Sequence, residues 1–245
     1  MKLAVIADIH GNYLALEAVL KDIEKQQISD VVNLGDCFSG PLDAGKTANI
    51  LMGYDFPTIR GNHDRYLIEQ KHEDMGPSDA CSYRQLSPAH FDWLRALPET
   101  LIFQEDIFLC HGTPTSDTTY WMERVTEKAE IVTRTQKEIE GHAKGIDCSL
   151  ILCGHTHLPR TCNFTNGQML VNPGSVGCPG YDDDQPIYHK VETGTANASY
   201  AIVEKTTLGW DVTFRQIAYD HMKMSELAEQ NGRQEWASAL ATGWL

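Results

Sequence analysis

Short apolar runs and amphipathic stretches alternate along the first part of the chain. Residues 2–7 and 31–34 are apolar runs of the length expected for buried strands, and 56–59 resembles them. Between them, apolar residues recur every three or four positions, so we predict helices over about 13–27 and near 43–53. An alternation of strands and helices is typical of an α/β sheet whose neighbouring strands run parallel.

The rest of the chain predicts hairpins, one further buried strand and short helices. Asn166-Gly167 is a strong two-residue turn signal, and Leu208-Gly209 separates another pair of apolar runs. Short helices are expected at 64–71 and 87–96, on either side of a loop around Gly76-Pro77. The predicted strand segments are 102–103, 107–109, 150–153, 160–164, 168–171, 199–204 and 210–214.

We expect residues 1–245 to form a single domain, because no linker-like stretch divides the chain. Residues 116–143 are rich in charge and carry apolar residues at helical spacing, which predicts a helical insertion. This insertion is either a lid over a site or an ordinary flanking helix, and the sequence favours neither. Beyond the last predicted hairpin, about 221–241 is expected to be a C-terminal helix.

Charge and cysteine content narrow the class of protein. The formal net charge is −14, which argues against binding of long nucleic acid by a basic surface and fits a small phosphorylated partner better. No apolar run approaches membrane-spanning length, and the N-terminal run lacks a signal-peptide cleavage site. Seven cysteines without a CxxC pair fit thiols in a reducing compartment, so we expect a cytoplasmic location. The oligomeric state stays open.

Side chains of the types that bind metals follow five of the apolar runs. These motifs are Asp8-Ile9-His10, Gly35-Asp36, Gly61-Asn62-His63-Asp64, His111-Gly112 and Gly154-His155-Thr156-His157. The carboxyl ends of parallel strands collect at one edge of a sheet, so the motifs should meet there. Together they supply enough ligands for two divalent ions, and two adjacent ions can clamp a phosphate and activate a water. The motifs therefore predict hydrolysis of a phosphoester.

The order of these motifs resembles that of the calcineurin-like metallophosphoesterase superfamily, and the likeness spans about residues 1–175. Residues 35–41 and 171–175 resemble the small bacterial and archaeal phosphodiesterase branch. The resemblance implies an α/β fold, a four-layer α-β-β-α sandwich with two mixed β-sheets flanked by helices. It also implies a phosphoric ester hydrolase, acting as a phosphodiesterase or phosphatase.

The resemblance further implies a role for each motif residue. Asp8, His10 and His157 would hold the first divalent ion, Asn62, His111 and His155 would hold the second, and Asp36 would bridge them. A bridging hydroxide would attack phosphorus, and His63 would protonate the leaving alkoxide while Asp64 accepts a hydrogen bond from it. The resemblance favours Mn, and the ligand types also suit Fe, Zn, Co or Ni.

Other functions remain open. A dinucleoside polyphosphate hydrolase or a phosphoprotein phosphatase would share the five motifs, and a groove walled by arginines would favour the dinucleotide. Arg65 and Arg160 flank two motifs and could grip a second phosphate, or else form surface salt bridges. The non-enzymatic alternative is a metal-binding scaffold of the retromer type, but such proteins typically lose the motif histidine, and His63 is present. We expect Asn12 to cap a helix and 182–184 to be a solvated loop.

Overall fold

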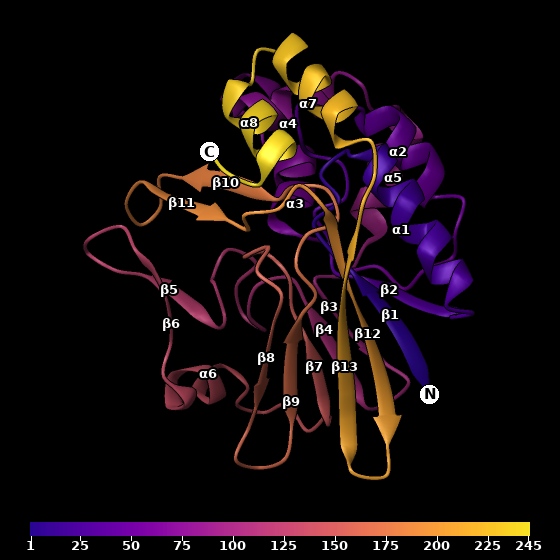
Figure 1. Cartoon of the computed structure of the whole chain (residues 1–245), viewed down its shortest axis with the longest axis vertical. Helices are drawn as coiled ribbons and strands as arrows, with labels where there is room; N and C mark the ends of the chain where they lie inside the picture. Colours follow the sequence, from indigo (N-terminus) through magenta and orange to yellow (C-terminus); the bar gives the residue numbers. More distant parts are fainter.

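Two mixed β-sheets form the centre of the molecule in the computed structural model, which describes residues 1–245 (Figure 1). The first sheet has the order β13-β12-β1-β2. Its strands are β1 (Lys2–Ile6), β2 (Asp30–Asn33), β12 (Ala198–Thr206) and β13 (Gly209–Ile217). Strand β1 pairs in parallel with β2 and antiparallel with β12, which makes this sheet mixed. The predicted hairpin across Leu208-Gly209 is confirmed.

The second sheet has the order β3-β4-β7-β9-β8 and is also mixed. Its strands are β3 (Thr100–Phe103), β4 (Ile107–Cys110), β7 (Leu150–Leu152), β8 (Arg160–Asn163) and β9 (Met169–Asn172). The central strands β4, β7 and β9 run parallel, so their carboxyl ends lie at one edge. The hairpin turn at Asn166-Gly167 is confirmed, with Gly167 at a φ of 90°.

The main core lies between the two sheets. Alternate residues of a strand point to opposite faces, so Leu3 and Val5 of β1 pack against β4 and β7 residues of the second sheet. Ala4 and Ile6 point the other way, into a cluster with apolar residues of the helices. All four side chains are fully buried. A strand with both faces buried explains why β1 reads as a continuous apolar run.

Helices cover the outer faces of both sheets, which confirms the four-layer sandwich. Figure 1 draws most helices beside the first sheet and α6 on the far side of the second. The helices are α1 (Tyr13–Lys25), α2 (Ala44–Leu51), α3 (Asn62–Glu69), α4 (Pro77–Tyr83), α5 (Pro88–Ala96), α6 (Gln136–His142), α7 (His221–Gln230) and α8 (Gln234–Thr242). The side chain of Asn12 accepts a hydrogen bond from the Ala15 N–H, so the predicted cap on α1 is confirmed. None of the helices combines the length and apolar character that crossing a membrane requires.

The prediction of a helical insertion over 116–143 is wrong for most of that segment. It folds as a two-stranded hairpin, β5 (Glu123–Val125) and β6 (Ile131–Thr133), followed by the short α6. The Thr126 hydroxyl accepts hydrogen bonds from the N–H groups of Lys128 and Glu130 in the turn, and Ala129 has a φ of 63°. The β-branched residues on either side of this turn favour strands, although their spacing also fits a helix.

Four smaller differences concern segments near the functional site. Residues 56–59 contribute only an isolated bridge to β2, because Pro57 has no N–H for a ladder. The loop after Gly76 is helix α4, whose first residue is a proline. The acidic run 182–184 lies largely in the hairpin of β10 (Gly180–Asp183) and β11 (His189–Glu192). The C-terminal helix is broken into α7 and α8 at Gly232, which has a φ of 77°.

Candidate metal centre

The five motifs meet at the carboxyl edge of the strands, as the sequence predicts. They follow β1, β2, β4 and β7, except that Asn62 opens α3. The predicted ligands with a positive φ are Asp8 (55°), His10 (50°), Asp36 (53°), His155 (70°) and His157 (59°). This backbone conformation is uncommon outside glycine and costs free energy, so it persists where surrounding contacts impose it, typically at functional sites. The turns therefore hold these side chains toward one point.

The first group of candidate ligands consists of Asp8, His10 and His157, and all three are buried. The Nε2 atoms of His10 and His157 are 3.2 Å apart, and Nε2 of His157 lies 3.5 Å from Oδ1 of Asp8. The Nδ1–H groups of the two histidines donate to the carbonyls of Ser39 and Cys178, each at 2.7 Å. A neutral imidazole held in this way turns the lone pair of Nε2 toward its neighbours.

A cation fits this first group on two observations. Two neutral imidazoles would bring their Nε2 lone pairs to 3.2 Å from each other, which is repulsive unless a proton or a metal ion lies between them. Oδ1 of Asp8 is buried and has no hydrogen-bond partner, which is costly for a carboxylate oxygen. Both features are satisfied by a divalent ion that accepts these atoms as ligands.

The second group consists of Asp36, His111 and His155, with Asn62 beside them. Nε2 of His111 lies 3.2 Å from Oδ2 of Asp36 and 3.1 Å from Oδ1 of Asn62. The Nδ1–H of His111 donates to the carbonyl of Leu34 at 2.7 Å, so its Nε2 also faces the group. An amide oxygen, a carboxylate and imidazoles form a mixed set that suits a divalent transition metal.

Asp36 lies between the two groups. Its Oδ2 is 3.2 Å from Nε2 of His111 in the second group and 3.8 Å from Nε2 of His10 in the first. Its Oδ1 accepts the backbone N–H of His63 at 2.9 Å, which fixes the carboxylate. Gly61 packs directly against this carboxylate, and a Cβ there would collide with it. The Asp36 carboxylate is therefore held within reach of both groups.

The buried imidazoles have strongly shifted pKa values. Burial lowers the pKa of His10 to about 4 and that of His155 to about 3, and neighbouring imidazoles add to both shifts. Burial alone would also lower the pKa of His111, but the Asp36 carboxylate outweighs it and raises the pKa to about 10. His10 and His155 therefore favour the neutral form that binds metals, while the acids attract positive charge to His111.

The prediction that Asp64 accepts a hydrogen bond from His63 is wrong. The Nδ1 of His63 is 2.8 Å from Oδ1 of Asp79 in α4, a residue that the sequence analysis did not single out. Asp79 is buried, and the Ser39 hydroxyl donates to the same oxygen at 2.5 Å. Asp79 belongs to a helix that sequence reading took for a loop. The Gly76-Pro77 pair was a usable signal, since proline favours the first turn of a helix.

Asp64 instead ties two backbone segments together, the loop at Asp36-Cys37 and the start of α3. Its carboxylate accepts the N–H groups of Asp36, Cys37 and Gly61 at 2.8, 2.9 and 3.0 Å. The side chain lies in the first turn of α3, where a carboxylate folds back over the helix N-terminus. Asp64 therefore positions the loop that carries Asp36, and it does not contact His63 through a hydrogen bond.

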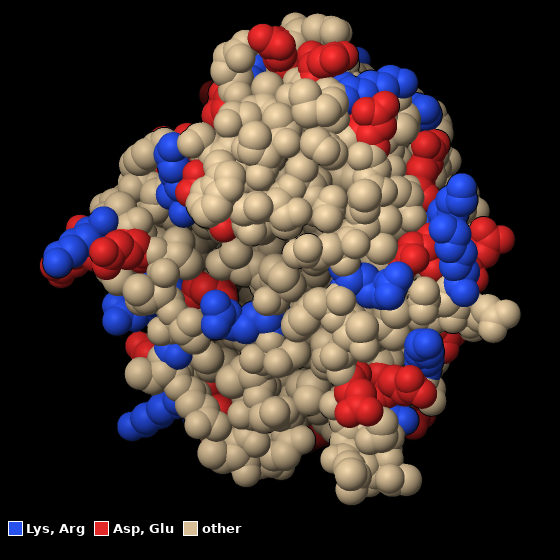
Figure 2. Space-filling model, viewed as in Figure 1, with Lys and Arg blue, Asp and Glu red and all other residues tan.

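A cavity of about 910 Å³ opens over both ligand groups. Its wall includes His10, Asp36, Asn62, His63, His155 and His157. Further lining residues come from α4, the β5–β6 hairpin, β10 and the α7–α8 turn. Figure 2 shows the hollowed region below the β10–β11 hairpin of Figure 1, with Lys and Arg side chains beside it. A cavity of this size accommodates a ligand considerably larger than a phosphate ion.

Two tyrosines at this cavity pack against the histidines of the Gly154–His157 motif. The ring of Tyr120 contacts that of His155 in a tilted arrangement at 5.0 Å between centroids, and Tyr181 contacts His157 edge-on at 4.6 Å. The hydroxyl of Tyr181 donates to that of Tyr120 at 2.8 Å, and Tyr120 is 3.0 Å from Nε2 of His189. These contacts fix the orientation of the two imidazoles from outside the ligand groups.

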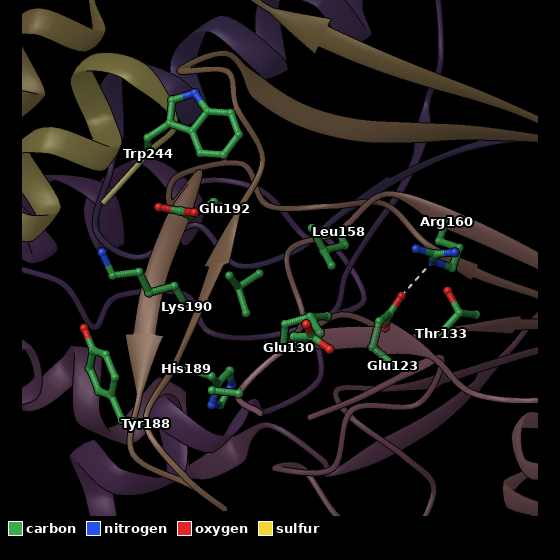
Figure 3. Close-up of a pocket in the computed structure, with 13 residues that line it drawn as sticks. Glu123, Glu130, Thr133, Leu158, Arg160, Tyr188, His189, Lys190, Glu192 and Trp244 are labelled. Carbon is green, nitrogen blue, oxygen red and sulfur yellow. Dashed lines mark ion pairs between the residues drawn. The ribbon is translucent and has the colours of Figure 1, made fainter. Parts of the chain in front are cut away.

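Neither arginine proposed from the sequence reaches the cavity. Arg65 forms a two-point ion pair with Asp117, at 2.7 and 2.9 Å. Arg160 lies 2.7 Å from the buried carboxylate of Glu123 in a separate cavity of about 570 Å³, which Figure 3 shows with Trp244 at its other end. Both are salt bridges, which was the alternative interpretation for each.

A comparison with protein families identifies this arrangement. Residues 1–196 match the Calcineurin-like phosphoesterase superfamily domain. The chain belongs to the calcineurin-like phosphoesterase superfamily. For a calcineurin-like phosphoesterase, metal-dependent hydrolysis of phosphoesters is the activity that membership supports, and the two ligand groups are consistent with binding of divalent metal ions.

One relative of similar length resembles this calcineurin-like phosphoesterase in sequence, and two solved structures share its fold. The Uncharacterized protein MJ0912 of Methanocaldococcus jannaschii is 24% identical over 96% of this chain and 94% of its own length. The crystal structure of a metallophosphoesterase from Sphaerobacter thermophilus has a TM-score of 0.77 and 24% identity, covering 99% of this chain and 100% of that one. The hypothetical protein PH1004 from Pyrococcus horikoshii has a TM-score of 0.74 and 20% identity, with coverage of 99% and 98%.

Proposed function

We propose that this protein is a metal-dependent phosphodiesterase or phosphatase that acts on a small phosphorylated substrate, with His63 as the general acid. The observation that carries the proposal is the presence of two adjacent ligand groups and the side chain of His63 in the wall of one cavity. A structural metal site has no need for a solvent-accessible cavity over its ligands. Open access to both groups therefore supports catalysis.

The proposed ligand roles are supported by the geometry of the two groups. Asp8, His10 and His157 are proposed to hold one ion, and Asn62, His111 and His155 the other, with Asp36 shared. When bound, two such ions supply neutralisation of the phosphoryl oxygens and a nucleophile from water at neutral pH. The residues themselves contribute a rigid frame, since backbone carbonyls and the N–H of His63 fix three imidazoles and the shared carboxylate.

His63 is proposed to deliver a proton to the leaving group. Its Nδ1–H is engaged by Asp79, so Nε2–H is the free donor, and about a third of the side chain is accessible from solvent (32%). Burial opposes the charged form, but the carboxylates of Asp79 and Asp36 raise the pKa of His63 to about 9. Both carboxylates thus favour the imidazolium form that a general acid requires. General acid catalysis of this kind contributes about 10²–10⁴-fold.

Mn is the metal that we propose for activity, with Fe, Zn, Co or Ni as alternatives that the same ligand types accept. The absence of a thiolate from either ligand group supports this choice over metals that prefer sulfur. We also propose a cytoplasmic location, which the seven free cysteines support, six of them buried.

A substrate panel tests the proposed function. Mn-loaded protein should hydrolyse at least one of bis-p-nitrophenyl phosphate, p-nitrophenyl phosphate, a cyclic nucleotide and a dinucleoside polyphosphate. His63→Ala should lose most of that activity while its metal content stays unchanged, and His72→Ala, which removes an exposed histidine outside the cavity, should behave as wild type. No turnover on any substrate with both metals bound would refute the proposal and favour a scaffold. Loss of metal in His63→Ala would show that His63 is a ligand.

A further inference from the structure

The β5–β6 hairpin separates the two cavities described above. In its register, Glu123 pairs with Thr133 and Arg124 pairs with Val132. Side chains alternate between the two faces of a strand, so Arg124 and Arg134 share the face opposite to that of Glu123 and Thr133. The lining of the two cavities is consistent with this alternation. Glu123 and Thr133 line the smaller cavity, whereas both arginines line the cavity over the ligand groups.

Neither arginine on this face forms an ion pair, although both interact at longer range with the exposed Glu138, and Arg134 also with Glu123. No ion pair within 4.0 Å involves Arg124 or Arg134, whereas Arg65, Arg160 and Arg233 each form one. Arg124 makes no side-chain hydrogen bond, and Arg134 makes one, from Nε to the carbonyl of Tyr120 at 3.3 Å. Their terminal nitrogens are free to donate. Like charges on one hairpin face repel each other, and an anion bound between them would relieve that repulsion.

The negative charge of the rest of the protein leaves Arg124 and Arg134 as an exception. The chain carries a formal net charge of −14, and Asp182 and Asp183 of β10 line another part of the same cavity. An anionic substrate is repelled by this field except near the metal ions and near Arg124 and Arg134. The α7–α8 turn also contributes Arg233, but Glu235 already neutralises it. The hairpin therefore provides the free cationic wall of the cavity.

We propose that Arg124 and Arg134 bind a second phosphate group of the substrate, which makes a phosphate ester or anhydride with at least two phosphates the preferred substrate class. A dinucleoside polyphosphate is the example with the size for a cavity of about 910 Å³. Guanidinium groups match phosphate oxygens through paired N–H donors, and lysine does not reproduce this geometry. This inference rests on the proposed function, because it assumes that the ligand groups hold the phosphate that reacts.

The test compares substrates that differ in the number of phosphates. Bis-p-nitrophenyl phosphate and the p-nitrophenyl ester of thymidine 5′-monophosphate each carry one phosphate, and the second adds a nucleoside. Diadenosine tetraphosphate carries four phosphates. The enzymes are wild type, Arg124→Gln, Arg134→Gln and Lys128→Gln, all loaded with Mn. Lys128 is a matched control, because it lies in the turn of the same hairpin, is exposed, and lines neither cavity.

We expect each arginine variant to raise KM for diadenosine tetraphosphate by about 10- to 100-fold, the range for a lost charge-assisted hydrogen bond. Values for both single-phosphate esters should change by less than about 2-fold, and Lys128→Gln should match wild type. Equal losses on all three substrates, an equal loss in Lys128→Gln, or wild-type preference for a single-phosphate ester would overturn the inference while the proposed function stands. Absence of any hydrolysis would instead refute the proposed function, and the inference with it.

Discussion

Replacement of Asp79 by asparagine should impair hydrolysis according to how basic the leaving group is. Oδ1 of Asp79 lies 2.8 Å from Nδ1 of His63, and the side chain is only 5% exposed. A hydrogen bond to a charged group contributes about 1.5–3 kcal/mol, which corresponds to roughly 10- to 150-fold in rate if all of it is lost in the transition state. Asparagine keeps the shape but not the charge, so His63 would be held less firmly and would hold its proton less well.

The assay compares two substrates of similar shape. Bis-p-nitrophenyl phosphate releases a stable phenolate that needs little protonation, whereas diphenyl phosphate releases a more basic one. Asp79→Asn should lower kcat on diphenyl phosphate by about 10- to 100-fold and on the nitro ester by less than about 3-fold. Ser39→Ala should have a smaller effect in the same direction, because its hydroxyl donates to Asp79 and leaves the contact with His63 in place.

Equal losses on the two esters would refute this reasoning, since they would indicate a general disturbance of the site. An unchanged kcat on diphenyl phosphate would show that Asp79 does not act through His63. Melting temperature and metal content, measured on each variant, separate these outcomes from partial unfolding or from loss of the ions.

Three further predictions concern the metal groups and the fold. Asp36→Asn should weaken binding of both ions, detectable by metal analysis after dialysis, because its Oδ2 faces both groups; loss of one ion alone would contradict a shared ligand. Gly61→Ala should abolish activity and lower metal content, because a Cβ collides with the Asp36 carboxylate; wild-type activity would exclude that constraint. The third prediction concerns Asp22. Burial raises the pKa of this carboxyl, but hydrogen bonds from Arg215 and Tyr200 outweigh burial and lower it. Because the pKa is lower in the folded state, the ionised carboxyl stabilises the protein at pH values above the unfolded pKa of 3.8. This stabilisation is lost as the pH falls below that value and through the folded-state pKa. Asp22→Asn should thus cost about 1–2 kcal/mol at pH 7, and a gap in melting temperature that persists in acid would contradict the assignment.

The sequence indicated which side chains would meet, because every candidate ligand except Asn62 follows a strand of a sheet. The carboxyl ends of parallel strands must meet at one edge, so the order of Asp8, Asp36, His111 and His155 along the chain was enough to place them together. The role of Asp36 between the groups was implied by the family resemblance, since the Gly35-Asp36 motif alone is too short to indicate it. The local apolar pattern and the sheet topology together were enough to predict that the motif residues meet at one edge.

The partner of His63 could not be predicted in the same way. Asp64 is its neighbour in sequence, but its carboxylate folds back onto backbone N–H groups at the start of α3. Asp79 lies 16 residues after His63 in the sequence and reaches it only through the packing of α4. This helix is too short for a periodic signal. Tertiary contacts of this kind leave no mark on the spacing of residues.

The β5–β6 hairpin shows a second limit of sequence reading. Val125, Val132 and Ile139 recur at intervals that fit a helix, yet the first two lie in or beside strands. Short segments of β-branched residues satisfy both periodicities, and here the turn at Thr126 decides between them. The helical prediction concealed a feature of the cavity, because the hairpin register is what brings Arg124 and Arg134 to one face of its wall.

The central claim is that two metal ions bound side by side make this protein a phosphoesterase. The most direct test is a titration of metal-free protein with Mn²⁺, with bound metal and hydrolysis of a phosphodiester followed in the same samples. We expect two ions to bind per chain and activity to rise with occupancy of the second site. Saturation at one ion, or two bound ions without hydrolysis of any phosphoester, would contradict it.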